Sequence, residues 1–225
     1  MPAPSTRGSR ERPVHHPLFA RFYERLSEAA DARAGVGAHR EELLAGLTGR
    51  VIEIGAGNGL NFARYPADVS RVTAVEPEPH LRASAVAAAR SEGVRVPVDV
   101  VAGTADALPA EDGAFDAAVF SLVLCSLPDV SRALEEVRRV LRPGGQLRFY
   151  EHGRAEGRPR MARFQRVLDG TVWPRLFGGC HTGREPVGQI SAAGFTEVSF
   201  RRLLVPERGP VFPTSFHVLG SARRP

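Results

Sequence analysis

The segment best suited to hold a ligand is Val51–Asn61, in which Gly55, Gly57 and Gly59 alternate with other residues after an apolar run. Alternate glycines let the backbone turn sharply and approach a ligand closely, and a following helix offers its first N–H groups to that ligand. The segment therefore predicts a nucleotide-like cofactor. Leu60 stands where the dinucleotide-binding pattern G-x-G-x-x-G requires its third glycine, so the loop departs from the dehydrogenase pattern.

A carboxylate follows the second apolar run at a distance typical of nucleotide-binding folds. Glu76 comes 21 residues after Gly55 (76 − 55 = 21), at the end of Val72–Val75. A carboxylate there can accept hydrogen bonds from both hydroxyls of a ribose and would repel a 2′-phosphate. The alternative is a solvated glutamate at a strand end, and the glycine loop before it favours the ribose role.

Two later segments carry side chains that could act on an acceptor. Leu124–Asp129 contains Cys125, and Phe149–Gly153 contains Glu151 and His152. Both follow predicted strands, and ligands of doubly wound sheets lie beyond the carboxyl ends of the strands. His152 is the candidate general base because the ordinary pKa of histidine, about 6.5, lies near working pH; a capping histidine is the alternative. Cys125 is a substrate contact or a small core residue, and we expect Glu151 to have a structural role or to set the polarity of the site.

Alternating strands and helices must position these segments. The expected strands are Arg50–Ile54, Arg71–Val75, Val96–Val101, Phe115–Phe120, Gln146–Tyr150, Phe195–Leu204 and Phe216–Ala222. The expected helices are Leu18–Leu26, Pro79–Glu92, Asp129–Leu141, about Arg160–Asp169 and about Arg184–Ala193. This alternation predicts an α/β fold of Rossmann-like type, with a mostly parallel seven-stranded sheet and helices on both faces. The short link between the last two strands predicts an antiparallel pair at the sheet edge.

Length and composition predict one domain without a membrane span. The chain has 225 residues and 43% hydrophobic side chains. We expect residues 1–14 to form a disordered basic tail and 15–225 a single domain, with lid helices in 15–45, a cofactor-binding core in 48–155, and substrate-side helices and final strands in 156–225. The N-terminus lacks the apolar region of a signal peptide, and the longest apolar run is about half a membrane span. Two cysteines are too few for a disulfide framework, which favours a cytoplasmic location.

The net charge of +5 comes from 30 basic residues, all of them arginine, against 25 acidic ones. An arginine excess is typical of nucleic-acid partners, and also of codon usage in a GC-rich genome. We favour the second explanation and expect no nucleic-acid partner, because the arginines are scattered and no binding module is recognisable. We also expect no metal site, since the remaining histidines show no ligand-like spacing with one another or with the cysteines. These are His15, His16, His39, His80, His181 and His217.

Five segments taken in order resemble class I S-adenosylmethionine-dependent methyltransferases, in the small-molecule branch that includes the type 11-like domains. They are Val51–Asn61, Val72–Pro77, Val101–Pro109, Phe115–Leu124 and Val140–Gly145. The resemblance implies S-adenosyl-L-methionine as cofactor. It implies that Glu53 steers the methionine amino group, that the three loop glycines and Asn61 contact the methionyl side, and that Ser121 offers its carbonyl to the ammonium.

The same resemblance implies the contacts of the adenosine half. Glu76 holds the ribose, Pro77 lies against the adenine, Ala105 offers its N–H to the ring, and Leu122 covers it. Thr104 stands where the family usually has aspartate, so a hydroxyl replaces one hydrogen bond but not the charge. The aromatic Leu18–Leu26 helix is expected to close over the cofactor as a lid.

A closer resemblance connects four segments to the branch that contains the animal alkyl thiol S-methyltransferases and related bacterial enzymes. They are Ser121–Ser126, Arg142–Gly145, Tyr150–His152 and Phe177–Arg184. It implies a small-molecule acceptor, of which a thiol is one candidate, because relatives methylate N, O, S or C centres. The membrane anchor of the animal enzymes has no matching apolar run here, so a membrane location is not carried over.

Two other functions stay open at this point. A nicotinamide-dependent oxidoreductase would share the fold, although Leu60 and the Pro143–Gly145 turn disfavour it. A module that binds the cofactor without catalysis is also compatible, because methyl transfer needs no universal catalytic residue. The sequence gives no oligomeric state.

Overall fold

The computed structural model describes residues 17–33 and 35–225. The tail expected in residues 1–14, and the first residues of the expected lid region, lie outside the described residues.

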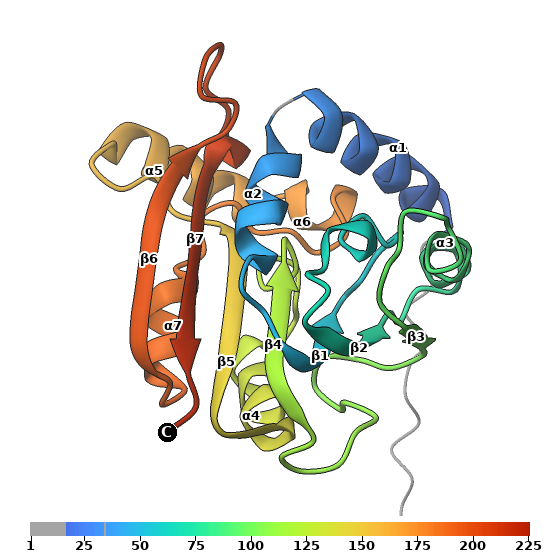
Figure 1. Cartoon of the computed structure of the whole chain (residues 1–225). Coiled ribbons are helices and arrows are strands. Elements are labelled where there is room, and N and C mark those ends of the chain that lie inside the picture. The colour runs from blue at the N-terminus through green and yellow to red at the C-terminus, as the bar shows by residue number, and fades with distance from the viewer. Residues whose placement is uncertain (1–16, 34) are drawn as a thin grey trace, which may run out of the picture.

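Seven strands form one sheet in the order β3-β2-β1-β4-β5-β7-β6 (Figure 1). Their bounds are β1 Gly49–Ile54, β2 Val69–Val75, β3 Val98–Val101, β4 Phe115–Ser121, β5 Leu141–His152, β6 Thr196–Leu204 and β7 Phe216–Arg223. The pairs from β3 to β5 are parallel, whereas β7 runs antiparallel to both β5 and β6. The expected fold class is confirmed: the sheet is mostly parallel and ends in an antiparallel edge pair. The carboxyl ends of β1, β2, β4 and β5 therefore meet at one edge.

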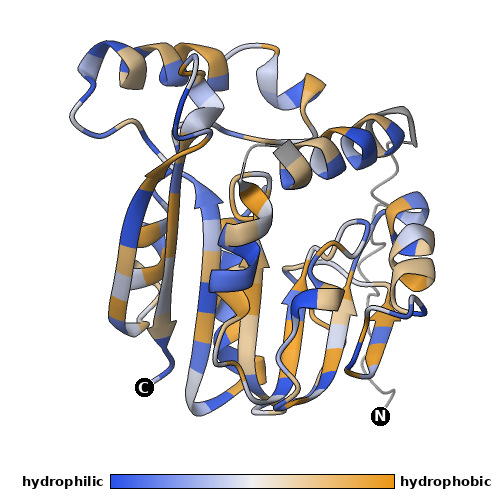
Figure 2. Ribbon diagram, turned by 45° about the horizontal axis from the view of Figure 1, so that its top comes forward, coloured by the Kyte–Doolittle hydropathy of each residue, from blue (hydrophilic) through white to orange (hydrophobic). Residues whose placement is uncertain are grey.

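Helices cover both faces of this sheet. They are α1 Pro17–Arg33, α2 Val36–Leu44, α3 Pro79–Ala88, α4 Val130–Val140, α5 Pro159–Asp169, α6 Trp173–Leu176 and α7 Pro186–Ala192, with short 3-10 turns at Phe62–Arg64 and Pro213–Ser215. One core cluster includes Leu134 of α4 and Ile190 of α7, and the other includes Leu43 of α2 and Ala85 of α3. Figure 2 shows the central strands as predominantly hydrophobic. Strands buried on both faces need such continuous apolar runs.

Helix α1 includes the expected helix Leu18–Leu26. The spacing of Leu18, Phe22 and Leu26 predicts one apolar stripe, and Phe22 and Leu26 of this stripe are 52% and 47% exposed. The helix instead buries Ala20 and Ser27, which lie on another face. Small side chains let α1 pack closely on α2 and α3, and periodicity alone does not show which face a helix turns to its neighbours.

Other differences concern where elements begin and end. Helix α3 ends at Ala88, four residues before the expected Glu92, because the hydrogen bonds of Arg90 and Ser91 shift to the i→i−3 pattern ahead of Gly93. Helix α7 begins at Pro186 rather than at Arg184. The short helix α6 begins at Trp173, in a segment where the sequence predicts no helix.

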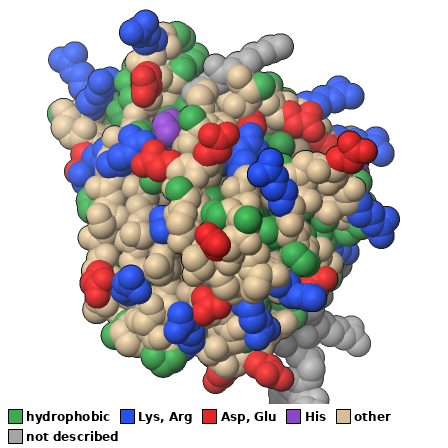
Figure 3. Space-filling view, viewed as in Figure 1, with side chains coloured by type: hydrophobic (Ala, Val, Ile, Leu, Met, Phe, Trp, Pro, Cys, Tyr) green, Lys and Arg blue, Asp and Glu red, His purple; other side chains and the backbone are tan. Residues whose placement is uncertain are grey.

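The arginine excess is dispersed over the surface. On the face shown in Figure 3, blue and red side chains are interspersed. Arg202 lies 2.6 Å from Glu156, and Arg201 forms an ion pair with Glu42. Such pairs between exposed groups contribute little to stability, about 0–1 kcal/mol each. Within the described residues, no helix is long and apolar enough to cross a membrane.

Candidate active site

The glycine loop turns between β1 and the 3-10 turn at Phe62, with positive φ at each glycine. The angles are 67°, 58° and 82° at Gly55, Gly57 and Gly59. A Cβ at position 55 would lie 2.7 Å from Val123, and one at position 59 would lie 2.7 Å from Phe62, so packing requires glycine at both. Among the described residues, a Cβ at position 57 would meet only Tyr23 of α1, at 3.7 Å. Gly57 is therefore buried beneath α1 but is less crowded than Gly55 and Gly59.

Glu76 fastens this loop to the end of β2. Its carboxylate accepts hydrogen bonds from the N–H groups of Gly57 (2.8 Å) and Glu78 (2.9 Å). Burial raises the pKa of Glu76, against the opposing effect of the two N–H donors. Each carboxylate oxygen keeps a further lone pair, so the group can also accept from a ribose. Pro77, the next residue, offers its carbonyl to Arg82.

Glu53 lies at the other side of the loop and is fully enclosed. It accepts hydrogen bonds from the Asn61 amide (2.7 Å) and the Tyr65 hydroxyl (2.8 Å). Burial raises the pKa of Glu53 to about 6, although both hydrogen bonds and Arg40 lower it. A buried carboxylate at this position can pair with a cation, as the ammonium of a methionyl group requires.

Arg40 of α2 is a residue of this site that sequence reasoning missed. Its Nη1 donates to Asn61 Oδ1 (3.0 Å) and Ser121 Oγ (2.8 Å), and its Nε lies 3.1 Å from Asp31. The guanidinium is buried between the glycine loop and the end of β4. Since 81 residues separate Arg40 from Ser121, no local spacing signals their contact.

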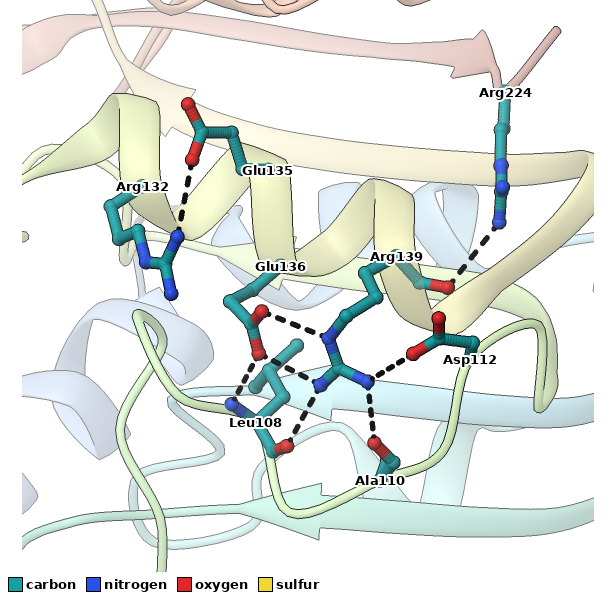
Figure 4. A network of polar contacts seen from close by, with 8 residues as sticks. All are labelled: Leu108, Ala110, Asp112, Arg132, Glu135, Glu136, Arg139 and Arg224. Carbon is teal, nitrogen blue, oxygen red and sulfur yellow. Dashed lines mark hydrogen bonds and ion pairs between the residues drawn. The ribbon is translucent and has the colours of Figure 1, made fainter. Parts of the chain in front are cut away.

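The Thr104–Ala105 turn, expected beside the adenine, is followed by the segment 108–112, which a polar network holds to α4 (Figure 4). Thr104 forms an isolated bridge with Ala107, and the N–H of Leu108 donates to Glu136 (2.9 Å). Arg139 donates to Glu136 and to the carbonyls of Leu108 and Ala110. Thr104 follows the end of β3 at Val101 by three residues.

Ser121 and Leu122 end β4 with a sharp change of direction. Leu122 has a φ of 62°, which is costly for a residue with a branched side chain, and its N–H donates to the carbonyl of Tyr150 (2.7 Å). Glu151 holds the following turn: its carboxylate accepts from the N–H groups of residues 123 and 124 at 2.8 and 2.9 Å, and from that of Cys125 at 3.3 Å. Glu151 therefore holds the backbone of this turn in place. Burial raises the pKa of Glu151 to about 7, against these three donors.

Three sulfur and imidazole groups meet beside this turn. Cys180 Sγ lies 3.8 Å from Cys125 Sγ and 3.6 Å from His152 Nδ1. Both cysteines are buried, and no disulfide joins them. The contact with the Cys125 thiol, together with the nearby His152, lowers the pKa of Cys180 against burial, and the same contact raises the pKa of Cys125. Burial acts to lower the pKa of His152, but Cys180 and Glu151 outweigh it and raise that pKa.

The loop that carries Cys180 is fixed to the β4 turn by its backbone. The N–H of His181 donates to the carbonyl of Cys125 (2.8 Å), and Arg184 donates to the carbonyls of Leu124 and Leu127. Gly179 has a φ of 87°, and a Cβ there would lie 2.7 Å from the carbonyl oxygen of Ser126. Glycine is thus required for this close approach. Sequence reasoning included His152 and Cys125 but missed Cys180, because no spacing rule connects it to them.

Helix α1 lies across the edge where these groups gather (Figure 1). Its Tyr23 is close enough to Arg40, Cys125 and Glu76 for their charges to affect its pKa, which burial raises to about 12. The neighbouring Glu24 forms a 3.0 Å ion pair with His80 of α3. Tyr23 therefore lies between the glycine loop and the sulfur cluster.

Comparison with known proteins adds three findings. A family model described as "Methyltransferase domain" matches residues 52–149. The chain is 35% identical over 182 residues to thiol S-methyltransferase TMT1B of Homo sapiens, covering 80% of this chain and 73% of that protein. It is 36% identical over 165 residues to human thiol S-methyltransferase TMT1A, covering 72% and 67%.

Among solved structures, the fold is similar to that of a SAM-dependent methyltransferase, possibly a histamine N-methyltransferase by its description, from Thermotoga maritima. The TM-score is 0.66 at 23% identity, and the match covers 92% of this chain and 98% of that one. At this identity the likeness concerns the fold.

Proposed function

Because the chain belongs to the S-adenosylmethionine-dependent methyltransferase family that includes the TMT1 thiol S-methyltransferases, we propose that its methyl acceptor is a small thiol. The chain is a methyltransferase, and its cofactor is S-adenosylmethionine. The alternative of a nicotinamide-dependent oxidoreductase is not supported. The observation that carries the thiol proposal is the 35% identity over 80% of the chain to an enzyme named for thiol S-methylation.

The residues present fit the cofactor. The spare lone pairs of Glu76 suit the hydroxyls of a ribose. The buried charged groups of Glu53 and Arg40 suit the ammonium and the carboxylate of a methionyl group. The uncrowded backbone at Gly57 lies between them. We propose that Glu76 binds the ribose, and that Glu53 and Arg40 orient the amino and carboxylate groups of the methionyl end. When bound, the cofactor supplies an electrophilic methyl group on a sulfonium.

The other cofactor contacts expected from the sequence stay proposals. The loop glycines and Asn61 would line the methionyl side, together with the Ser121 carbonyl. On the adenosine side, the proposed contacts are Pro77, Thr104, Ala105 and Leu122. Holding the acceptor within about 3–3.5 Å of the methyl group lowers the activation barrier by several kcal/mol. A site without water favours the reaction further, because the cofactor sulfur loses its positive charge during the transfer.

The acceptor side lies at the ends of β4 and β5. Cys125 and His152 are the proposed acceptor contacts there, and Cys180 joins them. Glu151 acts as a positioning residue, since it fixes the backbone that carries Cys125. The general-base role of His152 stays a prediction, and its Nδ1 lies 3.6 Å from the sulfur of Cys180.

We further propose that α1 and α2, in the 15–45 region, act as a lid. In this division residues 48–155 form the cofactor-binding core, and residues 156–225 contribute the acceptor side. The ion pair of Glu24 with His80 and the position of Tyr23 over Gly57 support the lid. Two free thiols in contact support a reducing, cytoplasmic location. The proposed acceptor is a small molecule rather than a nucleic acid.

The test is methyl transfer to matched acceptors. A short alkyl thiol, and the alcohol and amine with the same carbon skeleton, are offered with S-adenosylmethionine, and the methylated products are quantified by mass spectrometry. We expect kcat/KM for the thiol to exceed that of either analogue at least tenfold. A preference for the alcohol or the amine would remove the thiol as acceptor and leave the methyltransferase assignment in place.

A further inference from the structure

Three metal-ligand side chains come together from three separate segments of the chain. Cys125 follows β4, His152 ends β5, and Cys180 lies in the loop after α6. One ligand atom from each lies within 4.8 Å of the other two. We propose that Cys125, His152 and Cys180 bind a zinc ion whose open fourth position takes the acceptor thiol as a thiolate. The part that concerns the acceptor rests on the proposed function.

Two of the three separations between ligand atoms match those of a tetrahedral zinc site, and the third lies within 4.8 Å. With Zn–S bonds of about 2.3 Å and a Zn–N bond of about 2.0–2.1 Å, two sulfurs on zinc lie about 3.8 Å apart, and a sulfur and a nitrogen about 3.6 Å apart. The observed separations are 3.8 Å between the two Sγ atoms and 3.6 Å between Cys180 Sγ and His152 Nδ1. Little movement is therefore needed for these two edges to accept the ion.

The donor set selects the metal and its role. Thiolate sulfurs favour soft or borderline ions such as Zn²⁺ over Mg²⁺ or Ca²⁺, and imidazole suits zinc as well. Three protein ligands with an open position are typical of catalytic zinc, whereas structural sites have four. Two thiolates neutralise the charge of the ion, so the site formed by the three protein ligands adds no net charge to a buried region before the acceptor binds.

The surrounding residues hold the ligands in place before any metal binds. Glu151 accepts the N–H of Cys125, and the N–H of His181 donates to the Cys125 carbonyl, so both sulfur-bearing segments share one hydrogen-bonded frame. Gly179 permits the close contact of the Cys180 loop with Ser126. Outer contacts of this kind orient metal ligands and tune their affinity.

The chemistry follows from the open position. A thiol that coordinates zinc gives up its proton to solvent, because the ion stabilises the thiolate. The sulfur lone pair then forms the new S–CH₃ bond while the sulfonium–methyl bond breaks, and its electron pair stays on the cofactor sulfur. The products are a thioether, S-adenosylhomocysteine and one proton, and no group is oxidised or reduced. A neutral thioether binds zinc more weakly than a thiolate, which allows release.

Metal content of the purified full chain is the first measurement. The chain is purified under reductant, loaded with Zn²⁺ and then exchanged into metal-free buffer. Atomic emission measures the zinc that stays bound, and we expect about one zinc per chain. Cys125→Ser, Cys180→Ser and His152→Ala should each lower the retained zinc at least tenfold. His80→Gln, which changes a histidine outside the cluster, should retain it. Circular dichroism and thermal melting check that each variant is folded.

Cobalt substitution gives a readout that does not depend on activity. Co²⁺ bound by two thiolates absorbs in the near ultraviolet, and we expect this band to be lost in both cysteine variants. Addition of the alkyl thiol should change the visible bands of the cobalt protein, whereas the matching alcohol should not.

The outcomes separate this inference from the proposed function. If folded wild-type protein methylates the thiol without bound zinc, the metal site is wrong and the thiol acceptor is retained. A Cys125–Cys180 disulfide in the reduced preparation would also overturn the metal site. Zinc retained at full occupancy by the cysteine variants would place the ion elsewhere. Zinc bound at the cluster with no thiol-induced spectral change would overturn the role of the fourth position.

Discussion

The N–H of Gly57 donates a 2.8 Å hydrogen bond to the carboxylate of Glu76, so the glycine loop after β1 and the acid at the end of β2 form one surface. Gly57 and Glu76 are 19 residues apart in the chain, and each follows one of two strands that are neighbours in the sheet. Glu76 thereby fixes the loop and is available to the ribose, and both roles can be tested together.

Replacement of Glu76 by alanine should weaken cofactor binding. A hydrogen bond to a charged group contributes about 1.5–3 kcal/mol, so affinity for S-adenosylhomocysteine should fall roughly tenfold to hundredfold. Isothermal calorimetry measures this, and Glu92→Ala, an exposed change after α3, should have no effect. Unchanged affinity in a folded Glu76→Ala protein would remove the ribose assignment.

The proposed lid predicts a difference between two aromatic residues of α1. Tyr23 lies over Gly57, whereas Phe22 is 52% exposed. Tyr23→Ala should lower cofactor affinity about tenfold through loss of buried contact area, and Phe22→Ala should not. Deletion of residues 1–27 should reproduce the larger effect. Equal affinities for all three proteins in the same calorimetric titration would show that α1 does not close the site.

Gly179→Ala should displace the Cys180 loop. The new Cβ would meet the Ser126 carbonyl at 2.7 Å, and the positive φ would add strain. We expect kcat/KM for methyl transfer to fall at least tenfold while cofactor affinity changes less than twofold. Gly188→Ala, where α7 leaves space for a Cβ, is the matched control and should be neutral. A Gly179→Ala enzyme with wild-type kcat/KM would separate this loop from the acceptor site.

The raised pKa of Glu53 predicts how stability depends on pH. Tyr65, Asn61, Arg40 and Glu76 surround or influence the carboxyl group, and burial raises its pKa from 4.5 to about 6. The folded state therefore binds the proton more tightly than the unfolded state. The stabilisation is complete below about pH 4.5 and is lost as pH rises through about 6.

Glu53→Gln should remove this dependence, because the amide does not titrate. Between pH 4 and pH 7, the free energy of unfolding of the wild type should fall by about 2 kcal/mol relative to the variant. Urea denaturation at both pH values measures the difference. Glu92→Gln should show none. Parallel pH profiles for the wild type and Glu53→Gln would contradict the raised pKa.

The sequence predicted those features of the fold and site that depend on a pattern of nearby residues. The apolar runs and the glycines of residues 51–61 predict the order of strands and helices, because period and turn chemistry act over a few residues. Glu76 follows from its fixed distance to Gly55 within one β-α-β unit. The antiparallel edge pair follows from the short link between β6 and β7.

Only the tertiary structure decided which distant side chains meet. It placed Arg40 against Ser121 and brought Cys180 to Cys125, 55 residues away. It also left Phe22 of α1 half exposed, which the apolar spacing of the helix does not show. These contacts depend on how helices and loops pack over the end of a sheet. Packing depends on the summed burial of many residues rather than on the identity of any one. A pattern of neighbouring residues therefore does not predict which distant side chains come into contact.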